Sequence, residues 1–214
     1  MEFLFLVGHG LLSPISTIRW GMSRLQRTAA GLTPEQKRLI DHVHAHAKRL
    51  ALAVTSMLLV ARNEDQTYTI TPRMTRVRDL LALHTCGTGH PPAVHLRIAC
   101  PADAAVMGDR ALLDAAFRNL FAVFEEAHAD PCEVAVQVQP EEGSVTVHFA
   151  CSLHLSTLSV RSATDGNVHP AIGGTPGLLL SLTSSLLQCT HGSLTMRESD
   201  PGRYRITVHL VRAE

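Results

Sequence analysis

The sequence predicts an α+β chain in two parts, a helical hairpin followed by a two-layer α/β sandwich. Over residues 11–61 the apolar side chains recur at steps of four and three, which is typical of helices that pack against other helices. After Thr67 short segments with a period of two alternate with helical segments, which is typical of strands and helices in two layers. The predicted domains are residues 1–65 and 70–214.

The first predicted helix is marked by a heptad pattern. Successive apolar positions are separated by four, three, four and three residues, so they form one stripe along the helix. The chain then breaks near Gly31. The stripe consists of Leu11, Ile15, Ile18, Met22 and Leu25.

The second predicted helix begins at a capping box. Thr33 supplies the N-cap, Pro34 the first helical position and Gln36 the reciprocal side chain. The helix is expected to run to about Arg62. Its apolar stripe is formed by Leu39, Val43, Leu50, Val54, Met57 and Ala61.

Two amphipathic helices joined by a short turn have an apolar surface wider than one partner helix can cover. A second copy of the hairpin would cover the remainder in a four-helix bundle. The sequence therefore predicts a homodimer.

The second part alternates strands and helices. The Glu141-Glu142-Gly143 segment predicts a hairpin turn between two strands with alternating valines. Loops are expected at 87–92 and 152–175. We expect helices at 76–84, 109–128 and 177–189, and strands at 94–99, 133–139, 144–150, 193–198 and 203–211.

Composition excludes several function classes. Lys and Arg total 19 and Asp and Glu total 19, so the chain lacks the broad basic field that non-specific binding to nucleic acid or anionic membranes needs. Five scattered cysteines without a C-x-x-C pair argue against a disulfide framework and fit a reducing cytoplasm. The apolar run Phe3–Val7 lacks the basic flank of a signal peptide and is too short to span a membrane.

The segment Glu2–Trp20 resembles the H-box of two-component sensor histidine kinases, with the rough pattern F-L-x-x-x-S-H-E-L-R-T-P-L-T-x-I. His9 is followed five residues later by Pro14, inside a heptad helix that leads into a capped second helix. Residues 106–120 resemble the entry to the family's ATP-binding domain, and Gly173–Leu178 resembles its second glycine box. The resemblance implies a dimeric phosphotransfer hairpin followed by a sandwich of the histidine-kinase ATPase type.

His9 is the predicted phosphoacceptor. An imidazole nitrogen can accept a phosphoryl group as a phosphoramidate and pass it to an aspartate. Gly8 and Gly10 flank it, and Pro14 removes a backbone hydrogen bond to the Gly10 carbonyl, so we expect the helix to be loosened or kinked there.

Ser13 lies four positions after His9, where family members that dephosphorylate their partner carry Thr or Asn. Its hydroxyl could orient a water, or it could be an ordinary polar residue before a proline. We expect a response-regulator receiver domain to bind the first helix below His9, near Ser16, Arg19 and Ser23.

The sequence departs from the kinase pattern at four elements that ATP chemistry requires. Gly10 stands where the family has an acidic base, so autophosphorylation should be weak or absent. Val123 stands at the Mg²⁺-binding Asn of the N-box. The first glycine box is replaced by residues 151–155, Cys-Ser-Leu-His-Leu, and in the second box Leu179 or Leu180 replaces a phosphate-facing glycine.

We therefore expect no cofactor, and read Asn119, Gly173, Gly174 and Gly177 as vestiges of a nucleotide site. The pattern is similar to bacterial histidine phosphotransferases with kinase-like architecture. The leading hypothesis is phosphotransfer, or dephosphorylation of a receiver, through His9. Two alternatives remain: a histidine kinase core with a divergent site for ATP and Mg²⁺, and a non-catalytic dimeric scaffold that sequesters a regulator.

Other polar clusters have ordinary explanations. His42 and His46 share a helix face with the spacing of metal ligands, but no carboxylate or cysteine completes a site, so they are expected to be solvated or interface residues together with His44. Asp109 and Asp114 are five residues apart, on different helix faces, and are expected to be a helix cap and a surface charge.

Overall fold

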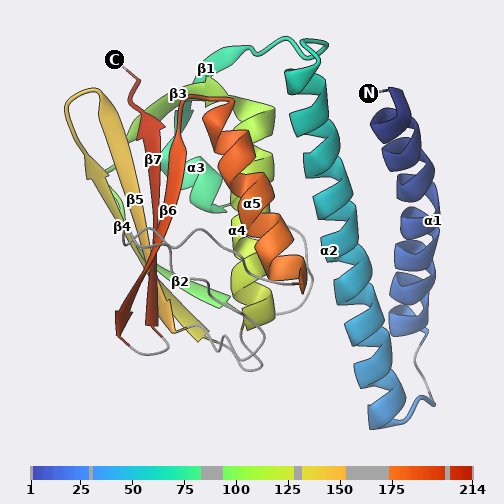
Figure 1. Cartoon of the computed structure of the whole chain (residues 1–214). Coiled ribbons are helices and arrows are strands. Elements are labelled where there is room, and N and C mark those ends of the chain that lie inside the picture. The colour runs from blue at the N-terminus through green and yellow to red at the C-terminus, as the bar shows by residue number, and fades with distance from the viewer. Residues whose placement is uncertain are drawn as a thin grey trace. The chain divides into compact units, whose positions relative to one another are not determined.

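The computed structural model describes residues 2–28, 31–82, 94–127, 132–152, 174–200 and 203–213 (Figure 1). The chain forms two compact units, Met1–Tyr68 and Thr69–Glu214. The first unit is a helical pair, and the second holds the described strands together with three helices.

The first unit is the predicted hairpin, with helices α1 (Glu2–Arg27) and α2 (Pro34–Glu64). The capping box is confirmed: Thr33 Oγ1 accepts from the Gln36 amide at 3.2 Å, and Gln36 Oε1 accepts from the Thr33 amide at 2.9 Å. The helix α1 continues through Pro14 without interruption. In the part of the chain that the structure describes, no helix is both long enough and apolar enough to cross a membrane.

The seam between α1 and α2 uses only part of the predicted heptad stripe. It is built from Ile15, Val54 and Leu58, with Leu12 and Ala51 packed beside them. Of the predicted stripe on α1, only Ile15 is buried in this seam, whereas Leu11, Ile18 and Leu25 are 43%, 46% and 43% exposed. An apolar repeat shows that a helix packs against something, but one partner helix covers only one stripe of a wider apolar surface.

The larger sheet has five strands in the order β2-β4-β5-β7-β6. The strands β2 and β4 run parallel, and the other neighbours are antiparallel. The five predicted strands are confirmed, with bounds that differ by two residues or fewer. The bounds are β2 (Val94–Ala99), β4 (Cys132–Pro140), β5 (Ser144–Ser152), β6 (Ser193–Asp200) and β7 (Arg203–Val211).

A smaller sheet was not predicted. Its strands β1 (Pro72–Arg76) and β3 (Ala105–Asp109) are antiparallel. The expected helix at 76–84 is found as the shorter helix α3 (Val77–Leu81), which begins one residue later because Arg76 closes β1. Only Thr75 is buried in β1, so this short strand lacks the alternation that would have indicated it.

Two helices cover one face of the larger sheet, α4 (Arg110–Ala127) and α5 (Gly174–Gln188), and they pack side by side (Figure 1). Apolar side chains that point inward from the strands meet α4. The ring of Phe149 lies 6.3 Å from that of Phe117 and 5.5 Å from that of Phe124, measured between centroids. The predicted loops at 87–92 and 152–175 lie almost entirely outside the described residues.

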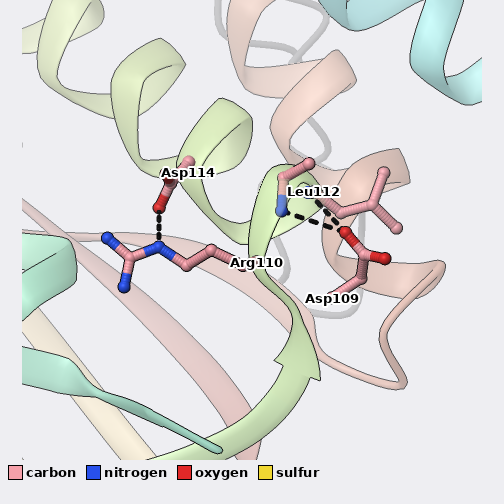
Figure 2. Close-up of polar contacts among 5 residues, drawn as sticks. Asp109, Arg110, Leu112 and Asp114 are labelled. Atoms are coloured by element: carbon pink, nitrogen blue, oxygen red, sulfur yellow. Dashed lines mark hydrogen bonds and ion pairs between the residues drawn. The ribbon is translucent and has the colours of Figure 1, made fainter. Parts of the chain in front are cut away.

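Asp109 closes β3 and caps α4, as predicted (Figure 2). Its Oδ1 accepts from the amides of Ala111 and Leu112 at 3.0 and 3.3 Å. Its Oδ2 accepts from the amide and the hydroxyl of Thr71 at 2.9 and 3.3 Å, which ties the entry of β1 to the start of α4. Asp114 pairs with Arg110 at 2.6 Å and is partly exposed.

We expect Asp109→Ala to lower the free energy of unfolding by about 1–3 kcal/mol, because the buried carboxylate of Asp109 caps α4 and also accepts from the Thr71 amide. Urea unfolding measures this change. Asp114→Ala is the control, with an expected loss of about 0.5 kcal/mol or less. Equal losses in the two variants would contradict the role of Asp109.

Candidate functional site

The predicted phosphoacceptor lies on α1, between two glycines. The backbone of His9 is helical, and its side chain lies outside the described part of the chain. The flanking glycines differ: a Cβ on Gly8 would come within 2.5 Å of Leu58 Cδ2, whereas a Cβ on Gly10 would meet nothing within 4 Å. Gly8 is thus a close-packing position against α2 and Gly10 is open, a difference that sequence reasoning missed.

The predicted receiver-binding residues share one helix. Ser16 and Arg19 are exposed and Ser23 is half-buried. Their spacing of three and four residues places them on one face of α1. Ser13, also exposed, lies one turn after His9, and its carbonyl accepts the Thr17 hydroxyl at 3.2 Å.

In the structure, His44 of α2 lies near Arg19, one of the predicted receiver-binding residues. This half-buried side chain of α2 has its pKa lowered, mainly by burial and also by the positive charges of Arg19 and Lys48. Asp41 and a hydrogen bond to the Arg19 backbone act in the opposite direction without reversing the shift. His44 is therefore a neighbour of a predicted receiver-binding residue, which the sequence pattern did not indicate.

This shift predicts a pH dependence of stability. The folded pKa of His44 lies below its ordinary value of 6.5, so the unfolded chain binds the proton more readily and stability falls as the pH drops below about 6.5. We expect His44→Gln to reduce the loss of stability between pH 7.5 and 5.5, as measured by urea midpoints. His42→Gln, on the exposed face of the same helix, serves as the control. If the His44→Gln variant lost as much stability as the wild type between pH 7.5 and 5.5, His44 would not be the source of the pH dependence.

Two neighbouring histidines of α2 lie close to each other. The rings of His42 and His46 lie edge to face with centroids 6.4 Å apart, and both side chains are exposed. Among the described residues, no group of three or more His, Cys, Asp or Glu side chains could hold a metal ion.

The described residues that were predicted to be vestiges of a nucleotide site lie on α4 and α5, which pack together. Asn119 is buried on α4, and Gly174 and Gly177 lie in the first turn of α5. Gly174 has φ of +79°, a conformation that suits glycine. Gly173 and residues 153–155 of the first-box segment lie outside the described residues.

The described side chains do not fit a Mg²⁺-nucleotide held in the kinase manner. Val123, where the resemblance places the Mg²⁺-binding Asn, is 2% exposed and has no side-chain oxygen to offer a hard cation. Leu179 and Leu180 are buried at the candidate positions of the phosphate-facing glycine. Cys151 is buried too, and its thiol donates to the Tyr204 carbonyl at 3.9 Å.

No protein-family model and no curated protein matches the sequence. Solved structures match the fold. The Acinetobacter baumannii histidine kinase AdeS is 10% identical, with a TM-score of 0.55 over 95% of this chain and 98% of that chain. Full-length ShkA in complex with AMPPNP is 18% identical, with a TM-score of 0.61 over 99% of this chain and 46% of that chain. A histidine kinase from Burkholderia phymatum STM815 is 15% identical, with a TM-score of 0.50 over 97% of this chain and 98% of that chain.

The chain has the histidine kinase fold. The predicted fold class is confirmed: an N-terminal helical hairpin precedes a two-layer sandwich of the histidine-kinase ATPase type. At identities of 10–18%, the likeness to these structures shows the fold alone. The activity has to be inferred from the residues at the site. In this histidine kinase fold, the H-box resemblance falls on α1. The described positions that depart from the family's nucleotide motifs fall on α4, α5 and the end of β5.

Proposed function

We propose that this protein carries phosphoryl groups on His9, to and from the receiver domains of two-component response regulators, without binding a nucleotide itself. The observation that carries the proposal is the buried Val123 at the metal position of a histidine kinase fold that retains His9 in its H-box-like helix. Phosphotransfer needs the histidine, whereas autophosphorylation needs a metal-bound nucleotide as well.

The transfer step needs little from this chain beyond an accessible imidazole. The unprotonated ring nitrogen of His9 attacks the phosphorus of a receiver's aspartyl phosphate, so an N–P bond forms as the P–O bond to the aspartate breaks. The aspartate leaves as a carboxylate, and the proton on the other ring nitrogen passes to water. Because the receiver supplies the activated phosphate, the absence of a carboxylate at Gly10 does not prevent this step.

The receiver is proposed to bind the exposed face of α1 that carries Ser16, Arg19 and Ser23. Charge and hydrogen-bonding groups on one helix face suit an acidic phosphorylation site. Ser13, exposed one turn from His9, supports a hydrolytic branch in which its hydroxyl orients a water toward the receiver's aspartyl phosphate.

A homodimer is part of the proposal, with residues 1–65 forming the dimerisation and phosphotransfer hairpin and residues 70–214 helping to bind the receiver. Large apolar side chains stay exposed on both helices of one hairpin, including Leu39 at 65% and Leu50 at 49%. A second hairpin would bury them in a four-helix bundle. The mass in solution tests this, and a stable monomer would contradict it.

The cytoplasm is the proposed compartment. Among the described cysteines, Cys100, Cys151 and Cys189 are thiols rather than disulfides, which suits a reducing environment.

The test is to incubate the protein with a phosphorylated receiver domain and, separately, with labelled ATP and Mg²⁺. We expect label to move from the receiver to this chain and none to come from ATP. Labelling from ATP would favour the alternative of a histidine kinase with a divergent site. Receiver binding without any labelling would favour a scaffold that sequesters the regulator, and either result would overturn the proposal.

A further inference from the structure

The two helices lie close together at Gly8, the residue that precedes the proposed phosphoacceptor. Three atoms of the Leu58 side chain lie where a Cβ on Gly8 would be, with Cδ2 at 2.5 Å, Cγ at 2.8 Å and Cδ1 at 3.1 Å. A substitution would therefore meet the branched part of the leucine as well as its tip. Since Leu58 is itself buried, it has little space into which to rotate.

Gly8 continues the seam of the hairpin. Leu12 and Ile15 follow it at steps of four and three residues, and both pack into the cluster with Val54 and Leu58. The three residues therefore lie on the stripe of α1 that faces α2. Among the described contacts of this seam, the one between Gly8 and Leu58 lies nearest to the start of α1.

The next residue along the helix is His9, whose backbone lies about 100° further round the helix axis. A change in the rotation or the spacing of α1 at Gly8 would move this backbone with it. Pro14 removes one backbone hydrogen bond from the same stretch of helix. The packing at Gly8 therefore contributes more to keeping this stretch in place.

We propose that Gly8 is a positioning residue for phosphotransfer, because its contact with Leu58 fixes the rotation of α1 at the turn that presents His9. This inference rests on the proposed function of His9. The proposed receiver-binding residues begin at Ser16, about 12 Å along the helix from Gly8. The contact therefore governs how well His9 meets the receiver's phosphate rather than how tightly the receiver binds.

The experiment compares Gly8→Ala with Gly10→Ala, a matched pair that adds the same methyl group on either side of His9. Initial rates of phosphate transfer from a phosphorylated receiver domain are measured over a range of receiver concentrations. We expect Gly8→Ala to lower the maximal rate roughly tenfold or more, with the receiver concentration at half-maximal rate unchanged. Gly10→Ala, with open space around the new methyl, should retain the wild-type rate.

Rescue separates positioning from a general loss of structure. In the double variant Gly8→Ala with Leu58→Ala, the space for the new methyl is restored, and the maximal rate should recover most of its loss. Leu58→Ala alone removes the contact without adding a methyl, so it should slow transfer even if Gly8→Ala does not fold. Circular dichroism confirms that each variant is helical at the assay temperature.

Equal rates for Gly8→Ala and Gly10→Ala, or wild-type transfer by Leu58→Ala, would overturn the positioning role while leaving the proposed function intact. A wild-type chain that takes no phosphate from the receiver would overturn the proposed function and the positioning role together. The two failures are therefore distinguishable.

Discussion

Replacing His9 with alanine is expected to lower phosphate uptake from a receiver domain by more than about a thousandfold, because the variant has no nucleophile at the phosphoacceptor position. Receiver binding and helix content should stay unchanged, since the proposed binding residues lie further along α1. Transfer of label from a phosphorylated receiver measures the effect. The control is His42→Ala, which removes an exposed histidine from α2 and should transfer normally.

Uptake by the His9→Ala variant at a rate near that of the wild type would mean that another side chain accepts the phosphate. A loss of receiver binding in the same variant would instead indicate that the imidazole belongs to the binding surface. Titration calorimetry with the unphosphorylated receiver separates these two results.

The largest expected effect on stability is that of Phe149→Ala, a loss of about 3–5 kcal/mol. The ring is fully buried at the centre of the larger sheet, between Phe117 and Phe124. Truncation leaves a cavity that the close-packed strands and α4 cannot fill. Urea unfolding followed by circular dichroism measures the loss, since the single tryptophan, Trp20, lies in the first unit.

The control for this variant is Val211→Ala, an exposed position at the end of β7, which should change stability by about 0.5 kcal/mol or less. A loss below about 1 kcal/mol for Phe149→Ala would contradict a packed aromatic core at this position.

Patterns among residues close in the sequence predicted the strands with one apolar and one polar face, and the start of the second helix. The alternating valines of β4 and β5 and the capping box at Thr33 are readable from neighbours in the sequence, and both are confirmed. The strands β1 and β3 were not predicted. Each is only five residues long, which is too short to show a clear alternation of apolar and polar residues. Their pairing joins segments that are far apart in the sequence, so no local pattern indicates it.

The candidate site was predictable only in part. The H-box pattern points to His9 and marks Gly10 as the position where the family has an acidic base, but it does not indicate that Gly8 packs against α2. The difference between them depends on Leu58, which reaches Gly8 only because the helices fold back on each other. The lowered pKa of His44 depends in the same way on Arg19 from the other helix.

Locating the phosphate on the chain tests whether His9 is the phosphoacceptor. The wild-type chain is incubated with a phosphorylated receiver domain in the absence of ATP, digested, and its peptides are analysed by mass spectrometry at alkaline pH. We expect one phosphate on the peptide that contains His9, stable in base and lost in acid, as a phosphoramidate is. An acid-stable phosphate on Ser13, or no phosphate on any peptide from α1, would contradict it.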